Sequence, residues 1–146
     1  MTARGSAVLY TPEILALAVE LAEFPHDEAY PRRGEAHSRV CGSQVVMGLE
    51  TDERDRVTAI GARVSACAIG QAAAALFLRS AMGRGFEEIA HASSGIERWL
   101  AGGGTEPDWP GIAALASARA YPARHPAILL PWKAALVALS NRNSED

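Results

Sequence analysis

Apolar residues recur at helical spacing in the first part of the chain. Thr11 is a suitable N-cap, and Pro12 suits the first helical position, where the missing N–H of proline has no intrahelical partner to lose. The apolar stripe that follows consists of Ile14, Leu17, Leu21 and Phe24, with Leu15 and Ala18 beside them. This spacing predicts a helix that ends near Pro25. The polar segment His26–Gly34, with charges of both signs, is then expected to be an exposed loop.

The pattern changes in the next part of the chain. Val40–Leu49 and Val57–Val64 are rich in β-branched residues and alternate, imperfectly, between apolar and polar positions. Alternation of this kind fits a strand better than a helix. The charged segment Thr51–Arg56 between them has the composition of a turn. The pattern therefore predicts a β-hairpin, and the segment from about Gly34 to Arg39 is a candidate third strand.

Helix-favouring residues dominate the rest of the chain. An Ala-rich run from about Ala72 is expected to end at Gly83, a natural C-cap. The further predicted helices are Gly85–Ala92, a segment that begins with the capping-box residues Ser94 and Glu97, a segment from Trp109 toward Tyr121, and a last helix after the rigid loop Pro122–Pro126. Pro131 is expected only in the first turn of that last helix, because a later proline would remove a backbone hydrogen bond. The buried positions of the last helix are predicted to be Leu130, Trp132, Ala135, Leu136 and Leu139.

Together these elements predict a single α+β domain over residues 1–146, with an ordered core from about residue 9 to residue 140. We expect a small antiparallel β-sheet of two or three strands, packed with about five helices. The 14 basic and 17 acidic residues give a net charge of −3 without a basic cluster, which argues against nucleic acid as a partner. No apolar run approaches the ~20 residues that a membrane span requires, so no membrane partner is expected.

Two cysteines, Cys41 and Cys67, are the main candidates for chemistry. The first residues lack the apolar core of a signal peptide, so we expect a cytoplasmic protein with free thiols. Cys41 precedes the predicted hairpin and Cys67 follows it, so the hairpin could return both sulfurs to the same end of the sheet. At a strand-to-helix junction, the thiolate of Cys67 could also be stabilised by unpaired helix N–H groups. The alternative is that both cysteines are small buried hydrophobic residues.

His125 is the third candidate, because a histidine in a rigid loop could approach the thiols as an imidazole ligand. The alternative is a loop histidine that is exposed or bonded to the backbone. The predicted site therefore consists of Cys41 and Cys67, with His125 as a further candidate metal ligand. No catalytic residue is predicted, because the sequence lacks a phosphate-binding loop, paired catalytic carboxylates and a nucleophile elbow.

The order of several short motifs, from about Leu9 to Leu139, resembles the iron–sulfur cluster assembly scaffolds of the NifU/IscU/SufU type. The spacing of the two cysteines fits the same family. The motifs are Leu9-Tyr10 with Ile14-Leu15, Cys41-Gly42 before the hairpin, Cys67-Ala68-Ile69 before the Ala-rich helix, and Pro122-Ala123-Arg124 with Leu130-Pro131-Trp132-Lys133-Ala134. The last motif is most similar to the SufU branch.

The resemblance implies a compact α+β fold of the SufE/NifU-like kind. It also implies sulfur delivery from a cysteine desulfurase and a cluster or zinc site made by three cysteines and an aspartate. Cys41 and Cys67 match the first two cysteines of the family. The aspartate position holds Ser43, and the third cysteine position holds Ala127; the histidine that precedes that cysteine in some members matches Pro126. Two of the four usual ligand positions therefore lack their ligand, with His125 as a possible substitute.

This depleted ligand set leaves three alternatives, because structural zinc and cysteine-ligated clusters usually need four protein donors. The chain could bind iron or a transient cluster, such as a 2Fe–2S cluster, or Zn²⁺, with an outside thiol completing the shell. Two chains could share one cluster in a homodimer. The third alternative is a degenerate scaffold without a cofactor, which acts as an interaction module for a cysteine desulfurase or another assembly protein. The first prediction is a scaffold-like protein that binds iron or a cluster, or accepts sulfur, through Cys41 and Cys67.

Overall fold

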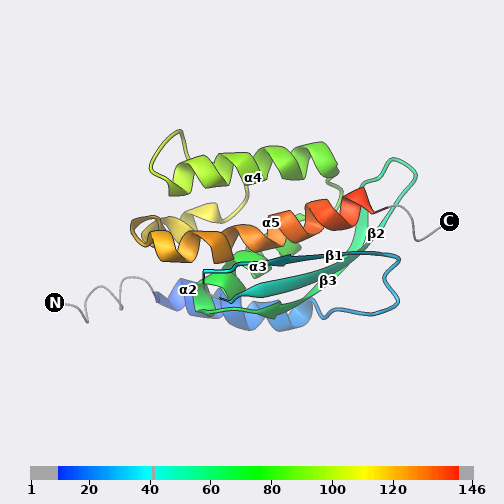
Figure 1. Cartoon of the computed structure of the whole chain (residues 1–146), viewed down its shortest axis with the longest axis horizontal. Coiled ribbons are helices and arrows are strands. Elements are labelled where there is room, and N and C mark those ends of the chain that lie inside the picture. The colour runs from blue at the N-terminus through cyan, green and yellow to red at the C-terminus, as the bar shows by residue number, and fades with distance from the viewer. Residues whose placement is uncertain (1–9, 41, 142–146) are drawn as a thin grey trace.

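The computed structural model describes residues 10–40 and 42–141 (Figure 1). The elements in these ranges are helix α2 (Pro12–Glu20), 3-10 helix η1 (Leu21–Glu23), strands β1 (Arg32–His37), β2 (Gln44–Thr51) and β3 (Val57–Ser65), helices α3 (Ala68–Ser80) and α4 (Phe86–Leu100), 3-10 helices η2 (Ile112–Ala120) and η3 (Pro122–Arg124), and helix α5 (His125–Ser140). The predicted α+β class with a small antiparallel sheet is confirmed. No helix in these ranges is both long and apolar enough to cross a membrane.

The sheet is a meander of three antiparallel strands in the order β1-β2-β3. The candidate third strand is therefore confirmed as β1, although β1 begins and ends two residues earlier than expected. The predicted strand Val40–Leu49 starts four residues too early, because a tight turn precedes β2. The N–H of Ser38 donates to the carbonyl of Ser43, and the N–H of Gly42 donates to the carbonyl of Ser38, both at 2.9 Å. Gly42 adopts a positive φ of 73° in this turn, which glycine does without steric cost.

One face of the sheet packs against α5, which runs alongside the strands in Figure 1. Val45, Met47 and Leu49 point to this inner face and are buried. Gly34 of β1 lies so close to α5 that an added Cβ would be 2.5 Å from the Ala138 amide nitrogen and would also overlap the Ala134 carbonyl oxygen. The absence of a side chain at Gly34 thus sets the close packing of β1 on α5.

The outer face of the sheet is partly covered by the segment between η1 and β1. Tyr30 lies over Gly48 and Gly61, whose missing side chains make room for its ring. Burial raises the pKa of Tyr30, and the carboxylates of Asp27 and Glu50 act in the same direction. The prediction of an exposed loop is therefore only partly right for this segment.

Arg32 is only 5% exposed. Its burial is a second departure from the prediction that residues 26–34 form an exposed loop. Its guanidinium bonds to the Thr51 hydroxyl at 3.0 Å and pairs with the Asp55 carboxylate at 3.1 Å. It also donates to the main-chain carbonyls of Leu139 and Asn141. These carbonyls lie at the C-terminal end of α5, where a cation is favoured by the helix dipole. Arg32 thus joins the sheet to the end of α5.

The first helix begins as predicted, because the Thr11 hydroxyl accepts a hydrogen bond from the Ile14 N–H at 3.1 Å. Ile14 and Leu17 are buried. Leu15, which the pattern predicts beside these residues in the apolar stripe, is 48% exposed, so that part of the prediction is wrong. The regular helix ends at Glu20 and tightens into η1 before reaching Phe24.

The middle helices differ from the predicted pair. α4 is one continuous helix, so the predicted capping box at Ser94 is wrong. Ile89 and Ile96 are both buried on one face of α4, and this face continues without interruption past Ser94. The capping hydrogen bond of α4 is instead at its N-cap residue Gly85, whose N–H donates to the Glu88 carboxylate at 3.2 Å. α3 ends at Ser80, before the predicted stop at Gly83.

The C-terminal part also departs from the prediction in two places. The segment after Trp109 forms the 3-10 helix η2 and no regular α-helix. Trp109 itself is buried, with its indole N–H donating to the Leu76 carbonyl at 2.9 Å, and its ring stacks on Phe77. Pro131 lies in the second turn of α5, beyond the first turn to which it was assigned. α5 begins at His125, inside the predicted loop Pro122–Pro126, and the burial of most of its residues offsets the lost proline hydrogen bond.

Candidate functional site

The end of the sheet near Cys67 brings two distant parts of the chain together. Gln44, the first residue of β2, pairs with Ser65, the last residue of β3. Residues just before β2 therefore lie beside residues just after β3. They line a shallow pocket of about 290 Å³, formed by Gly42, Ser43, Ser65, Ala66, Cys67 and Arg124.

Cys67 is the N-cap of α3 and carries a free, partly buried thiol. The strand-to-helix position predicted for it is confirmed. Its carbonyl accepts the N–H of Gln71 at 2.9 Å, and the Gln71 side chain donates to the carbonyl of Ala66 at 2.8 Å. The first N–H groups of α3 have no partner within the helix, so the start of α3 presents a partial positive charge beside the pocket.

Ser43 and Ala127, the two positions that the resemblance assigns to missing ligands, also lie near this end of the sheet. Ser43 is 4% exposed and lines the pocket with Cys67. Ala127 is buried in the first turn of α5 against α3, where a Cβ added to Gly70 would lie 3.4 Å from its methyl carbon. Gly70 lies one turn after Cys67. The chain therefore gathers three of the four positions and keeps a sulfur at one of them.

His125 is oriented toward the backbone. Its Nε2 atom lies 3.1 Å from the carbonyl oxygen of Ala118 in η2, and it does not line the pocket with Cys67. Its neighbour Arg124 lines the pocket and contacts the Tyr10 hydroxyl at 3.4 Å. Sequence reasoning missed this role of Arg124, although the residue belongs to the motif that carries the resemblance.

Cys41 lies outside the described residues, so its approach to Cys67 stays a prediction. Within residues 10–40 and 42–141, no group of three or more His, Cys, Asp or Glu side chains is arranged to hold a metal ion. The residues that the structure describes thus offer a single sulfur donor, Cys67, at this end of the sheet.

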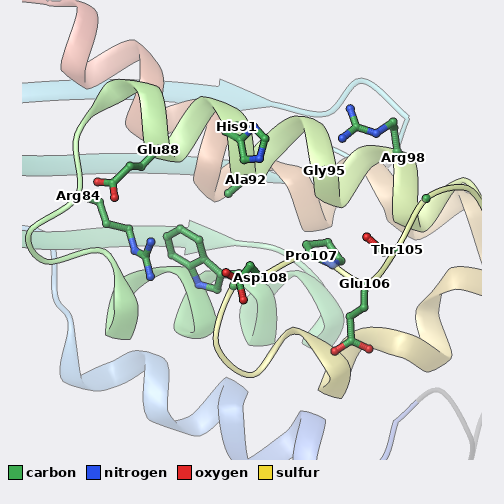
Figure 2. Close-up of a pocket in the computed structure, with 12 residues that line it drawn as sticks. Arg84, Glu88, His91, Ala92, Gly95, Arg98, Thr105, Glu106, Pro107 and Asp108 are labelled. Carbon is green, nitrogen blue, oxygen red and sulfur yellow. The ribbon is translucent and has the colours of Figure 1, made fainter.

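A larger cleft, of about 610 Å³, lies between α4 and the loop that precedes η2 (Figure 2). The guanidinium of Arg84 lies 4.3 Å from the ring centre of Trp109, which forms part of the wall. The described residues that line the cleft include carboxylates and arginines but no cysteine. The sequence analysis did not find this cleft, because it depends on the fold of the loop against α4.

The solved structures that are similar to this chain include the following two proteins. The N-terminal part of a nitrogen-fixing NifU-like protein from Brucella abortus is 26% identical, with a TM-score of 0.82 over 93% of this chain and 95% of that chain. A putative iron–sulfur cluster assembly scaffold protein for the SUF system from Fervidobacterium islandicum is 24% identical, with a TM-score of 0.79 over 90% of this chain and 96% of that chain. No protein-family model and no curated protein sequence matches this chain.

Proposed function

We propose that this chain, which has the NifU/IscU/SufU-type scaffold fold, takes part in iron–sulfur cluster assembly as a single scaffold-like domain. The observation that carries the proposal is the convergence of Cys67, Ser43 and Ala127 at one end of the sheet. These are three of the ligand positions implied by the resemblance. Cys41 directly precedes Gly42 in the sequence, and Gly42 lines the Cys67 pocket. This adjacency supports Cys41 as the second thiol.

The cluster, or the sulfur for it, is the cargo of this site. A cluster held by cysteine needs about four protein donors, and one chain offers at most two thiols, Cys41 and Cys67. Two chains in a homodimer, or one chain and an outside thiol, would complete the ligand shell. His125 is the weaker third candidate, because its ring is bonded to the carbonyl of Ala118.

Sulfur acceptance is the simplest chemistry that a single thiol supports. In this step, the thiolate of Cys67 attacks the outer sulfur of a persulfide on a cysteine desulfurase. A new S–S bond forms on Cys67, and the S–S bond of the desulfurase breaks to release its thiolate. No external oxidant or reductant is needed. The proposed partners are therefore a cysteine desulfurase and other assembly proteins, in the cytoplasm.

Ala127 occupies the third cysteine position of the family, and its methyl group cannot bind a metal. This substitution favours a second function. In this alternative, the chain is a metal-free interaction module that binds a desulfurase or another assembly protein. Its cysteines would then be inert. The two functions differ in whether Cys67 holds cargo.

Anaerobic reconstitution with iron and sulfide separates them. We expect visible charge-transfer absorption in the wild-type chain and its loss in Cys67→Ala, because the variant lacks a sulfur ligand. Circular dichroism of both proteins serves as the control for folding. A wild-type product that stays colourless with native helicity would contradict cluster binding and support the interaction module.

A further inference from the structure

The outer face of the sheet carries a polar cluster whose pocket shares no lining residue with the Cys67 pocket. Its members are His26, Glu28, Arg33 and Arg63, which we call the outer-face cluster. Arg33 comes from β1 and Arg63 from β3, the two outer strands of the sheet. They line a pocket of about 310 Å³ together with His26, Glu28 and a second carboxylate, that of Glu35 in β1.

One nitrogen of each basic side chain in the cluster lies near the carboxylate of Glu28. Arg33 Nη1 lies 2.7 Å from Glu28 Oε1, and Arg63 Nη2 lies 3.4 Å from Glu28 Oε2. His26 Nε2 lies 3.6 Å from the same Oε2 atom. Two arginines from different strands and an imidazole thus surround a single negatively charged group.

The imidazole of His26 is the observation that points to a ligand. Its side chain is 6% exposed, and neither ring nitrogen has a hydrogen-bond partner among the residues that the structure describes. The ring is seated over Gly48, where an added Cβ would lie 3.0 Å from His26 Cε1. Buried polar atoms without a partner are uncommon in folded proteins and call for a water, an ion or a ligand.

Glu28 is a weakly held occupant of this position. Its side chain is 71% exposed, and those of Arg33 and Arg63 are 52% and 57% exposed. Ion pairs at such exposure contribute little to stability. A ligand with more negative charge than one carboxylate can therefore take the place of Glu28, while both arginines keep a partner.

We propose that the outer-face cluster is a binding site for a doubly charged oxyanion of the phosphate class. The oxyanion displaces the carboxylate of Glu28, bonds to Arg33 and Arg63, and accepts a hydrogen bond from an imidazole N–H of His26. Arginine suits this role because its planar guanidinium matches phosphate oxygens. The ligand is either free phosphate or the phosphate group of a small molecule.

This site is separate from the thiol pocket, because the two pockets have no lining residue in common. The inference therefore does not depend on the proposed cluster function. Cys67→Ala should leave phosphate binding unchanged, so failure of either proposal can be recognised without affecting the other.

The test is a titration with inorganic phosphate at constant ionic strength, followed by the NMR signals of the His26 ring. We expect a saturable shift in the wild-type chain. Glu28→Gln should tighten binding about threefold or more, because it removes the carboxylate that pairs with both arginines, and Arg63→Met should weaken it about tenfold. Glu53→Gln, which makes the same charge change in the exposed β2–β3 turn, is the matched control and should behave as the wild type.

A parallel titration with glycerol 1-phosphate distinguishes the two sources. Tighter binding than inorganic phosphate would assign the site to a phosphorylated small molecule, and equal or weaker binding would assign it to the free anion. Shifts that do not saturate, or an equal effect of Glu28→Gln and Glu53→Gln, would overturn the proposal. Either result would mean that phosphate only screens the surface charge.

Discussion

Gly34→Ala is expected to lower the free energy of unfolding by about 3 kcal/mol, the upper part of the range for overpacked cores. The added methyl group would meet backbone atoms of α5 at Ala134 and Ala138, which cannot rotate away as a side chain can. β1 would have to move off α5, and this movement would disturb Arg32, which binds the end of the same helix. Urea unfolding followed by circular dichroism measures the change.

Gly95→Ala is the matched control, because it adds the same methyl group in a place with room. Gly95 lies inside α4, and its added Cβ would have Pro107 as its nearest neighbour at 3.9 Å. Alanine is favoured over glycine in a helix by about 1 kcal/mol, so this variant should be slightly more stable than the wild type. Equal stability of Gly34→Ala and the wild type would contradict the close packing of β1 on α5.

Cys67 is expected to receive sulfur when the chain is incubated with a cysteine desulfurase and cysteine. Intact-mass spectrometry should show the addition of one sulfur atom, and peptide mapping should place it on Cys67. Cys67→Ala should lose the adduct mapped to this position, because the variant lacks the accepting thiol. The expectation rests on the free thiol at the start of α3, in a pocket that a partner can reach.

Cys41→Ala provides the comparison for this experiment. Persistence of the adduct on Cys67 in that variant would identify Cys67 as the accepting thiol. An adduct found only on Cys41, or none on either cysteine in a folded protein, would contradict the role given to Cys67.

The sequence predicts the features that depend on local pattern. The Thr11-Pro12 start of α2, the two strands of the hairpin and the junction at Cys67 follow from residues that are neighbours along the chain. Sheet topology alone then explains why Ser43 and Cys67 share a pocket, since the hairpin returns the chain to the same end of the sheet.

The features that sequence reasoning missed depend on contacts between distant residues. Arg32 has the composition of a loop residue, and its burial depends on Thr51, Asp55 and the end of α5. Ser94 resembles a helix cap, yet the buried face of α4 continues past it. The outer-face cluster could not be found, because only the register of the three strands brings Arg33 and Arg63 to the carboxylate of Glu28.

Iron and acid-labile sulfide analysis of the anaerobically purified protein tests the cluster proposal most directly. We expect both elements in similar amounts in the wild-type chain and neither in Cys67→Ala. Wild-type protein that is folded and carries neither iron nor sulfide would contradict the view that this end of the sheet holds a cluster.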